Sequence, residues 1–320
     1  MNADVFPLHK TFVCMFRSHR CSMEKVRRIL VYVCKERAAP QRAQFVQSVT
    51  GLFTDSDEDE VEVSCWLGKN QFILSGGNEG KRVPLKRPSF CPIKHLSASE
   101  AAAIPLDVQQ RGVDVGVSIL LQTANRRLLL TRRAQQLRIF PNVWVPPGGH
   151  VEPDETLLEA GLRELEEETG LKLQPEEVSP GILGLWESVF PPMLSRGLPQ
   201  RHHVVVYMLL HSPLTHLQLQ PSLSPSPAEV SACVWVDSRL ARAVVSAMDG
   251  EDGEAHLDAE LPSSFSVSQV SADGSLTESS LPQAVFITRA PSSGPDVERV
   301  STGTKYALKL WLRSLDTPET

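Results

Sequence analysis

The chain lacks the features that mark secreted, membrane-spanning or disulfide-stapled proteins. Its six cysteines are spread over 320 residues without a Cys-x-x-Cys pair, so we expect neither a disulfide framework nor a zinc site. No apolar run approaches the roughly 18 residues needed to cross a bilayer. Charges at Lys10, Arg17 and Arg20 interrupt the apolar stretch that a secretory signal requires. We therefore expect an intracellular, cytoplasmic protein without a membrane partner.

Positive charge is also scarce. The formal net charge is -6, which argues against an extended basic surface that would grip long nucleic acid regardless of its sequence. A nucleotide or the end of an RNA is compatible with this balance. The 41% apolar and 22% charged fractions are ordinary for a globular protein. No feature of the sequence indicates an oligomeric state.

Residues 1–105 are predicted to form a small β-rich region that is separate from the rest of the chain. Runs of β-branched and aromatic residues predict its strands, and Gly68-Lys69-Asn70 is a turn signal between two of them. Nothing in this region indicates a chemistry. The expected elements are strands at 26–34, 61–67 and 71–74, a weakly periodic helix at 42–53 and a solvated acidic loop at 55–62.

Residues 111–316 predict a larger domain in which strands alternate with helices. Such alternation is typical of an α/β (α+β) fold, in which a mixed sheet lies between helices. The expected strands are 113–121, 127–133, 182–189, 203–210 and 230–236, and the expected helices are 156–169, 238–248 and 304–315.

Residues 249–300 differ in composition from the rest of this domain. They are rich in Asp, Glu, Ser, Pro and Gly, and such a segment buries too little apolar surface to offset the entropy of ordering it. Helical spacing returns afterwards at Tyr306, Leu310 and Trp311. We therefore predict a flexible insertion that interrupts the domain.

The most informative pattern in the chain lies between Gly149 and Leu171. Five residues separate Gly149 from Glu155, seven more follow, and then comes the run from Arg163 to Leu171, Arg-Glu-Leu-Glu-Glu-Glu-Thr-Gly-Leu. Gly170 is the residue expected to end a helix in the left-handed conformation. The spacing predicts a loop that enters a helix rich in carboxylates.

Three of these carboxylates share one face of the expected helix. Glu164 meets Glu167 and Glu168 three and four residues later, and they would repel one another without a neutralising charge. Clustered carboxylate oxygens are ligands that Mg²⁺ or Mn²⁺ binds while keeping positions for water and phosphate. We therefore expect a divalent-metal site, and an exposed acidic helix without metal is the alternative.

The spacing G-x5-E-x7-R-E-U-x-E-E-x-G-U, where U is apolar, resembles the Nudix box at every position. The resemblance implies a Nudix αβα sandwich with a mixed sheet. It also implies metal-dependent hydrolysis of the pyrophosphate in nucleoside diphosphate-X substrates. By the same resemblance Glu164, Arg163 and Glu167 are catalytic, Glu164, Glu167 and Glu168 bind the metal, and Gly149, Glu155 and Gly170 are structural.

Residues outside the box are candidates for completing the site. A fourth acidic group often does so, and Glu187 and Glu229 are the candidates; either could equally be an ordinary carboxylate at a strand end. Trp144, Trp186 and Phe190 could stack on a base or pack in the core.

Arginines gather just before the box, where their planar guanidinium groups suit phosphate. The stretch from Leu129 to Gly149 resembles the signature of the coenzyme A diphosphatases of this family. It departs from that signature at Asn142, which replaces Gly, and at Pro146, which replaces Phe. The candidate phosphate ligands are Arg132, Arg133 and Arg138.

Over most of its length the chain resembles a vertebrate branch of the Nudix family. Besides the box, the resemblance rests on residues 111–114 (Arg-Gly-Val-Asp), 184–188 (Gly-Leu-Trp-Glu-Ser) and 302–305 (Thr-Gly-Thr-Lys). Several animal Nudix proteins hydrolyse the 5′ cap of mRNA. The resemblance therefore implies that the substrate is the 5′ m7G cap, cut to release m7GDP, or a dinucleoside polyphosphate. Coenzyme A is the alternative substrate, and a non-catalytic nucleotide-binding module is the second alternative.

Overall fold

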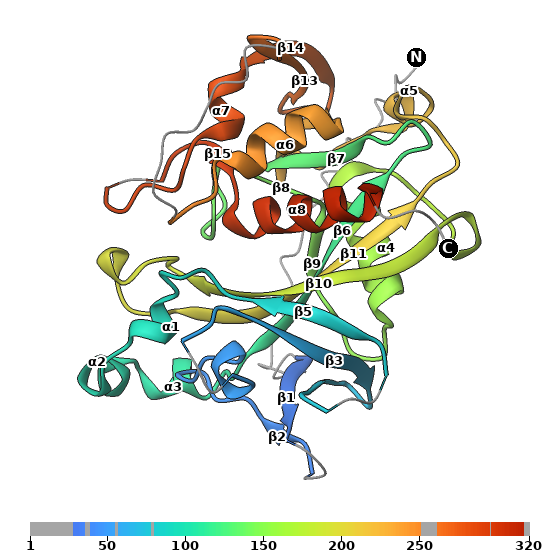
Figure 1. Ribbon diagram of the computed structural model, residues 1–320. Helices are drawn as coiled ribbons and strands as arrows, with labels where there is room; N and C mark the ends of the chain where they lie inside the picture. Colours follow the sequence, from blue (N-terminus) through green and yellow to red (C-terminus); the bar gives the residue numbers. More distant parts are fainter. Residues whose placement is uncertain are drawn as a thin grey trace, which may run out of the picture.

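Strands between residues 30 and 300 pair in one mixed sheet (Figure 1). The computed structural model describes residues 28–35, 39–54, 57–77, 80–250, 261–294 and 296–316. In these residues the strands are β1 (Leu30–Cys34), β2 (Gln41–Arg42), β3 (Glu60–Gly68), β4 (Gln71–Ser75), β5 (Arg82–Lys86), β6 (Asp114–Gln122), β7 (Leu128–Arg133), β8 (Val143–Val145), β9 (Gly148–His150), β10 (Ser179–Phe190), β11 (Arg201–His211), β12 (Val230–Val236), β13 (Ser264–Val270), β14 (Leu276–Pro282) and β15 (Arg299–Val300).

The helices surround this sheet. No helix in the described ranges is long and apolar enough to pass through a membrane. The α-helices are α1 (Pro92–His95), α2 (Ala98–Ala103), α3 (Leu106–Gln109), α4 (Leu157–Thr169), α5 (His216–Leu219), α6 (Ser238–Ser246), α7 (Gln283–Ile287) and α8 (Thr302–Asp316), and the 3₁₀ helices are η1 (Thr50–Leu52), η2 (Pro175–Glu177), η3 (Leu194–Arg196) and η4 (Gln220–Ser222).

The strands of the N-terminal region are continuous with the rest of the sheet. β5 pairs in parallel with β10 through Leu85 and Leu185, and β1 pairs with β6 through Leu30 and Asp114. Together these pairings close a ring of seven strands in the order β6, β11, β10, β5, β3, β4 and β1. The predicted β-rich character of this region is confirmed. The expectation that it stands apart is wrong for its described residues, because a single core cluster joins both parts.

The predicted helix at 42–53 is also wrong. The structure has only β2 and the short η1 turn there. The backbone amides of Val49 and Thr50 instead donate hydrogen bonds of 2.8 Å to the carboxylate of Glu187. A tertiary contact to a buried charge therefore overrides the weak local spacing. Part of the predicted acidic loop, residues 55–56, and residues 26–27 lie outside the described residues.

α4 and α8 cover opposite faces of β6 and β11, as expected for the predicted αβα sandwich (Figure 1). Side chains alternate between the two faces of a strand. On β6, Val117 and Ile119 belong to the core cluster that includes α4, whereas Leu120 belongs to the cluster that includes α8. On β11, Val206 likewise faces the α4 cluster and Tyr207 the α8 cluster. The mixed α+β fold with two helical layers is confirmed.

Capping residues fix both ends of α4. The Thr156 hydroxyl accepts a hydrogen bond from the amide of Glu159, and the Glu159 carboxylate accepts one from the amide of Thr156 over 2.7 Å. This reciprocal pair satisfies two amides that the first turn leaves free. Gly170 ends the helix at φ 74°, a left-handed conformation that glycine adopts without strain. The residues that follow Gly149 in the box therefore start and stop the helix where its spacing predicts.

The segment predicted to be a flexible insertion has regular structure over most of its length. β13 pairs with β12, β14 pairs with β13, and α7 and β15 follow. The prediction is wrong for residues 261–294 and 296–300; residues 251–260 lie outside the described part of the chain. The few apolar residues here, such as Val267 and Phe286, are nearly all turned inward, while Ser, Thr and Glu take outward positions. Average composition therefore underestimated the burial.

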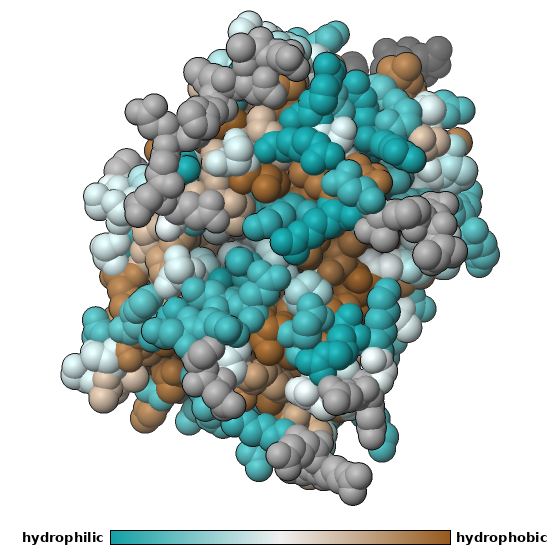
Figure 2. Space-filling view, viewed as in Figure 1, coloured by the Kyte–Doolittle hydropathy of each residue, from teal (hydrophilic) through white to brown (hydrophobic). Residues whose placement is uncertain are grey.

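Hydrophilic side chains cover much of the face shown in Figure 2, and apolar ones are visible between them across the middle of the molecule. The large hydrophobic side chains with most exposure in the described ranges include Leu106 and Leu217, which lie on short helices far apart in the sequence. Single exposed residues of this kind are normal for a folded domain.

Candidate active site

Arg163 holds three glutamates of the box in place. Its Nε and Nη2 atoms donate to the two carboxylate oxygens of Glu155 over 2.7 and 3.0 Å, which is a bidentate ion pair. Its Nη1 donates to Glu164 over 2.9 Å and to Glu167 over 3.2 Å, and Nη2 also donates to the carbonyl of His150. Glu155 thus ties the loop before α4 to the helix. One cation also fixes the direction of two carboxylates that would repel each other.

The glycines of β9 bring α4 close to the sheet. A Cβ atom on Gly149 would lie 2.3 Å from Oε1 of Glu164, and one on Gly148 would lie 2.2 Å from the carbonyl oxygen of Val117. Gly148 has no room for a side chain, because the contact is with backbone, and a side chain at Gly149 would displace the Glu164 carboxylate. The Glu164 carboxylate therefore lies directly against the backbone of β9.

Glu168 is the most buried carboxylate of the box. It is 6% exposed, and its Oε2 atom has no hydrogen-bond partner. Burial and the charges of Glu164 and Glu229 raise the pKa of Glu168 to about 8, although Arg133 and the amide of Gly148 act in the opposite direction. A buried, unpartnered carboxylate oxygen beside a second carboxylate is an arrangement that a divalent cation would neutralise.

The donor set of the box fits a hard divalent ion, because it offers only carboxylate oxygens. Within the part of the chain that the structure describes, no three His, Cys, Asp or Glu side chains already converge into a cation cluster. The Arg163 guanidinium draws the carboxylates of Glu164 and Glu167 toward itself. Glu167 has a side chain that is 55% exposed, so it can turn from Arg163 toward Glu168. With that rotation the residues present fit the ion.

Arg133 is the candidate phosphate ligand that lies beside the glutamates. Burial lowers the pKa of Arg133, while the charges of Glu168, Glu229 and Glu164 raise it. Its Nε atom donates to the carbonyl of Ile139 over 3.2 Å. Its guanidinium therefore lies in the electrostatic field of the box glutamates.

Arg132 and Trp144 hold the C-terminal segment. Arg132 and the Trp144 indole both donate to the carboxylate of Glu298, over 2.9 and 3.0 Å. The guanidinium of Arg132 also lies 5.6 Å from the centre of the Trp144 ring, and Trp144 is fully buried. The structure does not bring either residue to the glutamates of the box. Arg138, the third candidate, is exposed.

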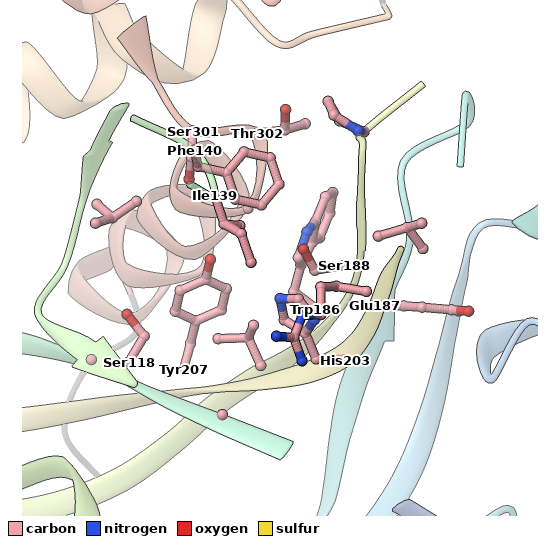
Figure 3. Close-up of a pocket in the computed structure, with 18 of the residues that line it drawn as sticks. Ser118, Ile139, Phe140, Trp186, Glu187, Ser188, His203, Tyr207, Ser301 and Thr302 are labelled. Atoms are coloured by element: carbon pink, nitrogen blue, oxygen red, sulfur yellow. The ribbon is translucent and has the colours of Figure 1, made fainter. Parts of the chain in front are cut away.

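Glu187 is not brought to the box glutamates either. Its buried carboxylate accepts hydrogen bonds from the amides of Val49 and Thr50 and from Ser48 Oγ, and it hydrogen-bonds His202 Nε2 over 3.1 Å. Burial raises the pKa of Glu187, but His202 and Thr50 outweigh it and hold the value at about 2. Figure 3 shows its carboxylate pointing away from the cavity. This carboxylate organises the fold around it.

Glu229 lies close enough to the box to affect both of its buried carboxylates. It precedes β12 and is exposed. Its negative charge contributes to the raised pKa values of Glu164 and Glu168. Of the two candidates for a fourth acid, Glu229 is the one whose charge acts on the box glutamates.

A cavity of about 280 Å³ opens beside β9 (Figure 3). Its floor is the sheet face opposite α4, and its walls come from the loop before β8 and the start of α8. Gly148, Gly149 and Arg133 line it, so the cavity borders the box. An aromatic-lined cavity with a few polar groups beside a cluster of carboxylates suits a base next to a phosphate. The labelled lining residues are Ser118, Ile139, Phe140, Trp186, Glu187, Ser188, His203, Tyr207, Ser301 and Thr302.

Of the three aromatic residues singled out from the sequence, only Trp186 lines this cavity. Its ring also packs against Tyr306 at 5.4 Å between centroids. Phe190 instead makes an edge contact with Phe140, at 5.1 Å between centroids. Trp186 therefore combines a core contact with a face that borders the cavity.

Sequence reasoning missed His203, Tyr207 and the start of α8. A Cβ on Gly303 would lie 2.5 Å from the Tyr207 hydroxyl and 2.9 Å from Trp186, so this glycine lets α8 close against the cavity floor. The motif at 302–305 and the alternation of residues along β11 are the sequence features that could have indicated these residues. Only the three-dimensional structure shows that β11 and the start of α8 line the same cavity.

Asn142 occupies a left-handed conformation, with φ 58°. This is the position at which the coenzyme A signature has glycine. Asparagine tolerates such a conformation better than most residues, so the backbone there suits glycine equally well. Pro146 lines the cavity.

The family model described as NUDIX domain matches residues 112–255. The chain is 63% identical over 294 residues to the m7GpppN-mRNA hydrolase NUDT17 of Danio rerio, which is 92% of this chain and 98% of that protein. It is 43% identical over 283 residues to the NUDT17 of Homo sapiens, which is 86% of this chain and 85% of that protein. The chain belongs to the Nudix hydrolase family. The resemblance that the box predicted is confirmed.

This Nudix chain also matches solved structures of the family. The MutT/nudix family protein from Enterococcus faecalis is 18% identical, with a TM-score of 0.35, over 70% of this chain and 71% of that one. The relatives named above are similar to this Nudix hydrolase along nearly its whole length, well beyond the box.

Proposed function

We propose that this Nudix hydrolase cleaves the pyrophosphate linkage of the 5′ m7G cap of mRNA and releases m7GDP, with Mg²⁺ or Mn²⁺ as its cofactor. The observation that carries the proposal is its similarity to m7GpppN-mRNA hydrolases over 92% of this chain and 98% of the Danio rerio relative. A dinucleoside polyphosphate has the same linkage and is the second substrate we propose.

The box glutamates are proposed to hold the cation. Glu164, Glu167 and Glu168 are the ligands, and the bound ion would polarise the phosphoryl oxygens and lower the pKa of a water. Glu168 has an unpartnered oxygen for this purpose. The pKa of Glu164 is raised by burial, which suits a group that accepts a proton from the attacking water. Glu229 is the second carboxylate that we propose for this step.

The remaining residues are proposed to position the substrate. The cavity accepts the base, with Trp186 and Phe140 as its aromatic borders. Arg133 lines the cavity and feels the charges of the glutamates, and these observations support it as a ligand of the phosphate between the nucleoside and the scissile bond. Arg163 orients Glu164 through its hydrogen bond to that carboxylate.

Product analysis by mass spectrometry tests the proposal. The protein is incubated with Mg²⁺ or Mn²⁺ and a panel of m7G-capped RNA, unmethylated capped RNA, diadenosine polyphosphates, NADH and coenzyme A. We expect m7GDP and a 5′-phosphorylated RNA from the capped substrate. Phosphopantetheine from coenzyme A, without m7GDP, would show that the differences at Asn142 and Pro146 are tolerated and would overturn the proposal. A protein inert on the whole panel would favour a nucleotide-binding module.

A further inference from the structure

Two arginines lie beside one buried carboxylate next to the cavity, and two more lie near them. Arg28 donates to Asp114 over 3.1 Å, and Arg201 lies 3.9 Å from the same carboxylate. Burial lowers the pKa of Arg201, and the positive charges of Arg28, Arg111 and Arg138 lower it further. Arg201 therefore lies in the positive field of the other three side chains. We call Arg28, Arg111, Arg138 and Arg201 the arginine rim.

The rim continues the floor of the cavity. On β11, His203 and Tyr207 line the cavity, and Arg201 precedes His203 by two residues, so it points to the same face. On β6, Ser118 lines the cavity and Asp114 precedes it by four residues on the same face. Asp114 pairs in register with His203. The rim therefore begins where the floor of the cavity ends, at the N-terminal ends of two parallel strands.

The positive charges of the rim are only partly compensated. Asp114 is shared by two arginines, and its side chain is 4% exposed. Arg111 pairs with Asp107 over 3.4 Å, but that carboxylate is 74% exposed and therefore weakly bound. Arg138 is exposed. In the described part of the chain, the carboxylates within ion-pair distance of these four arginines are Asp114 and Asp107, which leaves a local positive excess on a chain whose net charge is -6.

We propose that the arginine rim binds the backbone phosphates of single-stranded RNA that follows the capped nucleotide. This inference rests on the proposed function, because it takes the cavity and the box to hold the cap. Guanidinium groups that are partly exposed and come from different segments of the chain suit the phosphates of a flexible strand. The rim recognises the charge of the chain and carries no base specificity.

Binding of uncapped RNA tests the rim without turnover. The probe is a fluorescent single strand of about 20 nucleotides, long enough for several phosphates to reach a site of this size. The double variant Arg28→Gln with Arg111→Gln is expected to bind about tenfold more weakly than the wild type, with a shallower dependence on salt. The matched control, Arg239→Gln with Arg242→Gln on α6, removes two exposed arginines and is expected to bind like the wild type.

Hydrolysis distinguishes the rim from the cap site. The same double variant is expected to lose about tenfold in kcat/KM on capped RNA and to stay within about twofold on the dinucleotide m7GpppG. Equal losses on both substrates, or unchanged RNA binding, would overturn the inference. If neither substrate is cut by the wild type, the proposed function fails, while the binding result still decides the inference. Arg111→Gln alone, which leaves the Asp114 pairs intact, covers the case in which the double variant does not fold.

Discussion

Glu168 is expected to lower the stability of the metal-free protein and to be required for catalysis. It is buried beside Glu164 and keeps one oxygen without a partner. Glu168→Gln is expected to lower kcat at saturating Mg²⁺ by about 100-fold or more, because a metal ligand is lost. In metal-free buffer above pH 8, where Glu168 is ionised, its thermal midpoint is expected to stay level or to rise, because a buried like charge is removed.

The matched control is Glu166→Gln. Glu166 lies on the same helix but pairs with Lys172 over 3.2 Å on an exposed surface. It is expected to keep full activity. Retained activity in Glu168→Gln, or a collapse of its metal-free stability, would contradict the role that we propose for this residue.

His203 predicts how stability responds to acid. Burial lowers the pKa of His203 from its ordinary 6.5 to about 3. Between these values the unfolded chain binds a proton that the folded protein does not, so the stability contributed by neutral His203 is full above pH 6.5 and declines as the pH falls toward 3. From pH 7 to pH 5 this contribution decreases by about 2 kcal/mol.

Urea unfolding of the wild type and of His203→Gln at pH 7 and pH 5 measures this difference. The variant is expected to lose less stability than the wild type over that interval. His211→Gln, at the exposed end of the same strand, is the control and should follow the wild type. Equal losses in wild type and His203→Gln would show that His203 does not stay neutral in the folded protein.

At the residue scale, the sequence predicted the box far better than its surroundings. The spacing of three and four residues along a helix brings Glu164, Glu167 and Glu168 to one face, and such spacing can be read from the local sequence. The environment of Glu187 depends on η1, more than a hundred residues away in the chain, and on His202 across a strand pair. No local pattern contains that information, and the same holds for the arginine rim.

A buried ion pair fastens α8 to the end of α6. Lys305 Nζ lies 2.8 Å from the carboxylate of Asp249, and both side chains are fully buried. The same ammonium donates to the carbonyls of Ala247 and Thr288. Lys305→Met is expected to lower the free energy of unfolding by about 3 to 5 kcal/mol, because it leaves the buried charge of Asp249 without its cation.

Chemical denaturation measures that loss, with Lys309→Met on the same helix as the control. Adding Asp249→Asn to Lys305→Met should recover part of the stability, because the unpaired charge is then removed. A loss below about 1 kcal/mol in Lys305→Met would contradict the view that this pair secures the α8 wall of the cavity.

At the element scale, predictions succeeded where hydrophobic periodicity was strong. β12 has the bounds 230–236 that its pattern predicts, and α4 starts at its capping box. The failures at 42–53 and 249–300 have one cause. Contacts with residues distant in the sequence decide both structures. The buried carboxylate of Glu187 does so at 42–53, and a few buried apolar residues do so at 249–300. Local composition does not contain these contacts.

The ring of seven strands makes the molecule one cooperative unit. We expect a single heat-absorption transition in calorimetry, because the N-terminal strands and the Nudix strands share one core cluster. A truncated chain that begins at residue 111 is expected not to fold, since β6 and β10 would lose partners at their edges. An early, separate transition for the N-terminal region would contradict this expectation.

The parallel pairing of β5 with β10 has a consequence for folding during synthesis on the ribosome. A hundred residues separate Lys86 from its partner Trp186. At about 5 to 20 residues per second, the ribosome needs roughly 5 to 20 s to make that stretch. For that interval the nascent N-terminal strands have an unpaired edge, so a chaperone that covers exposed strands would have its longest opportunity there.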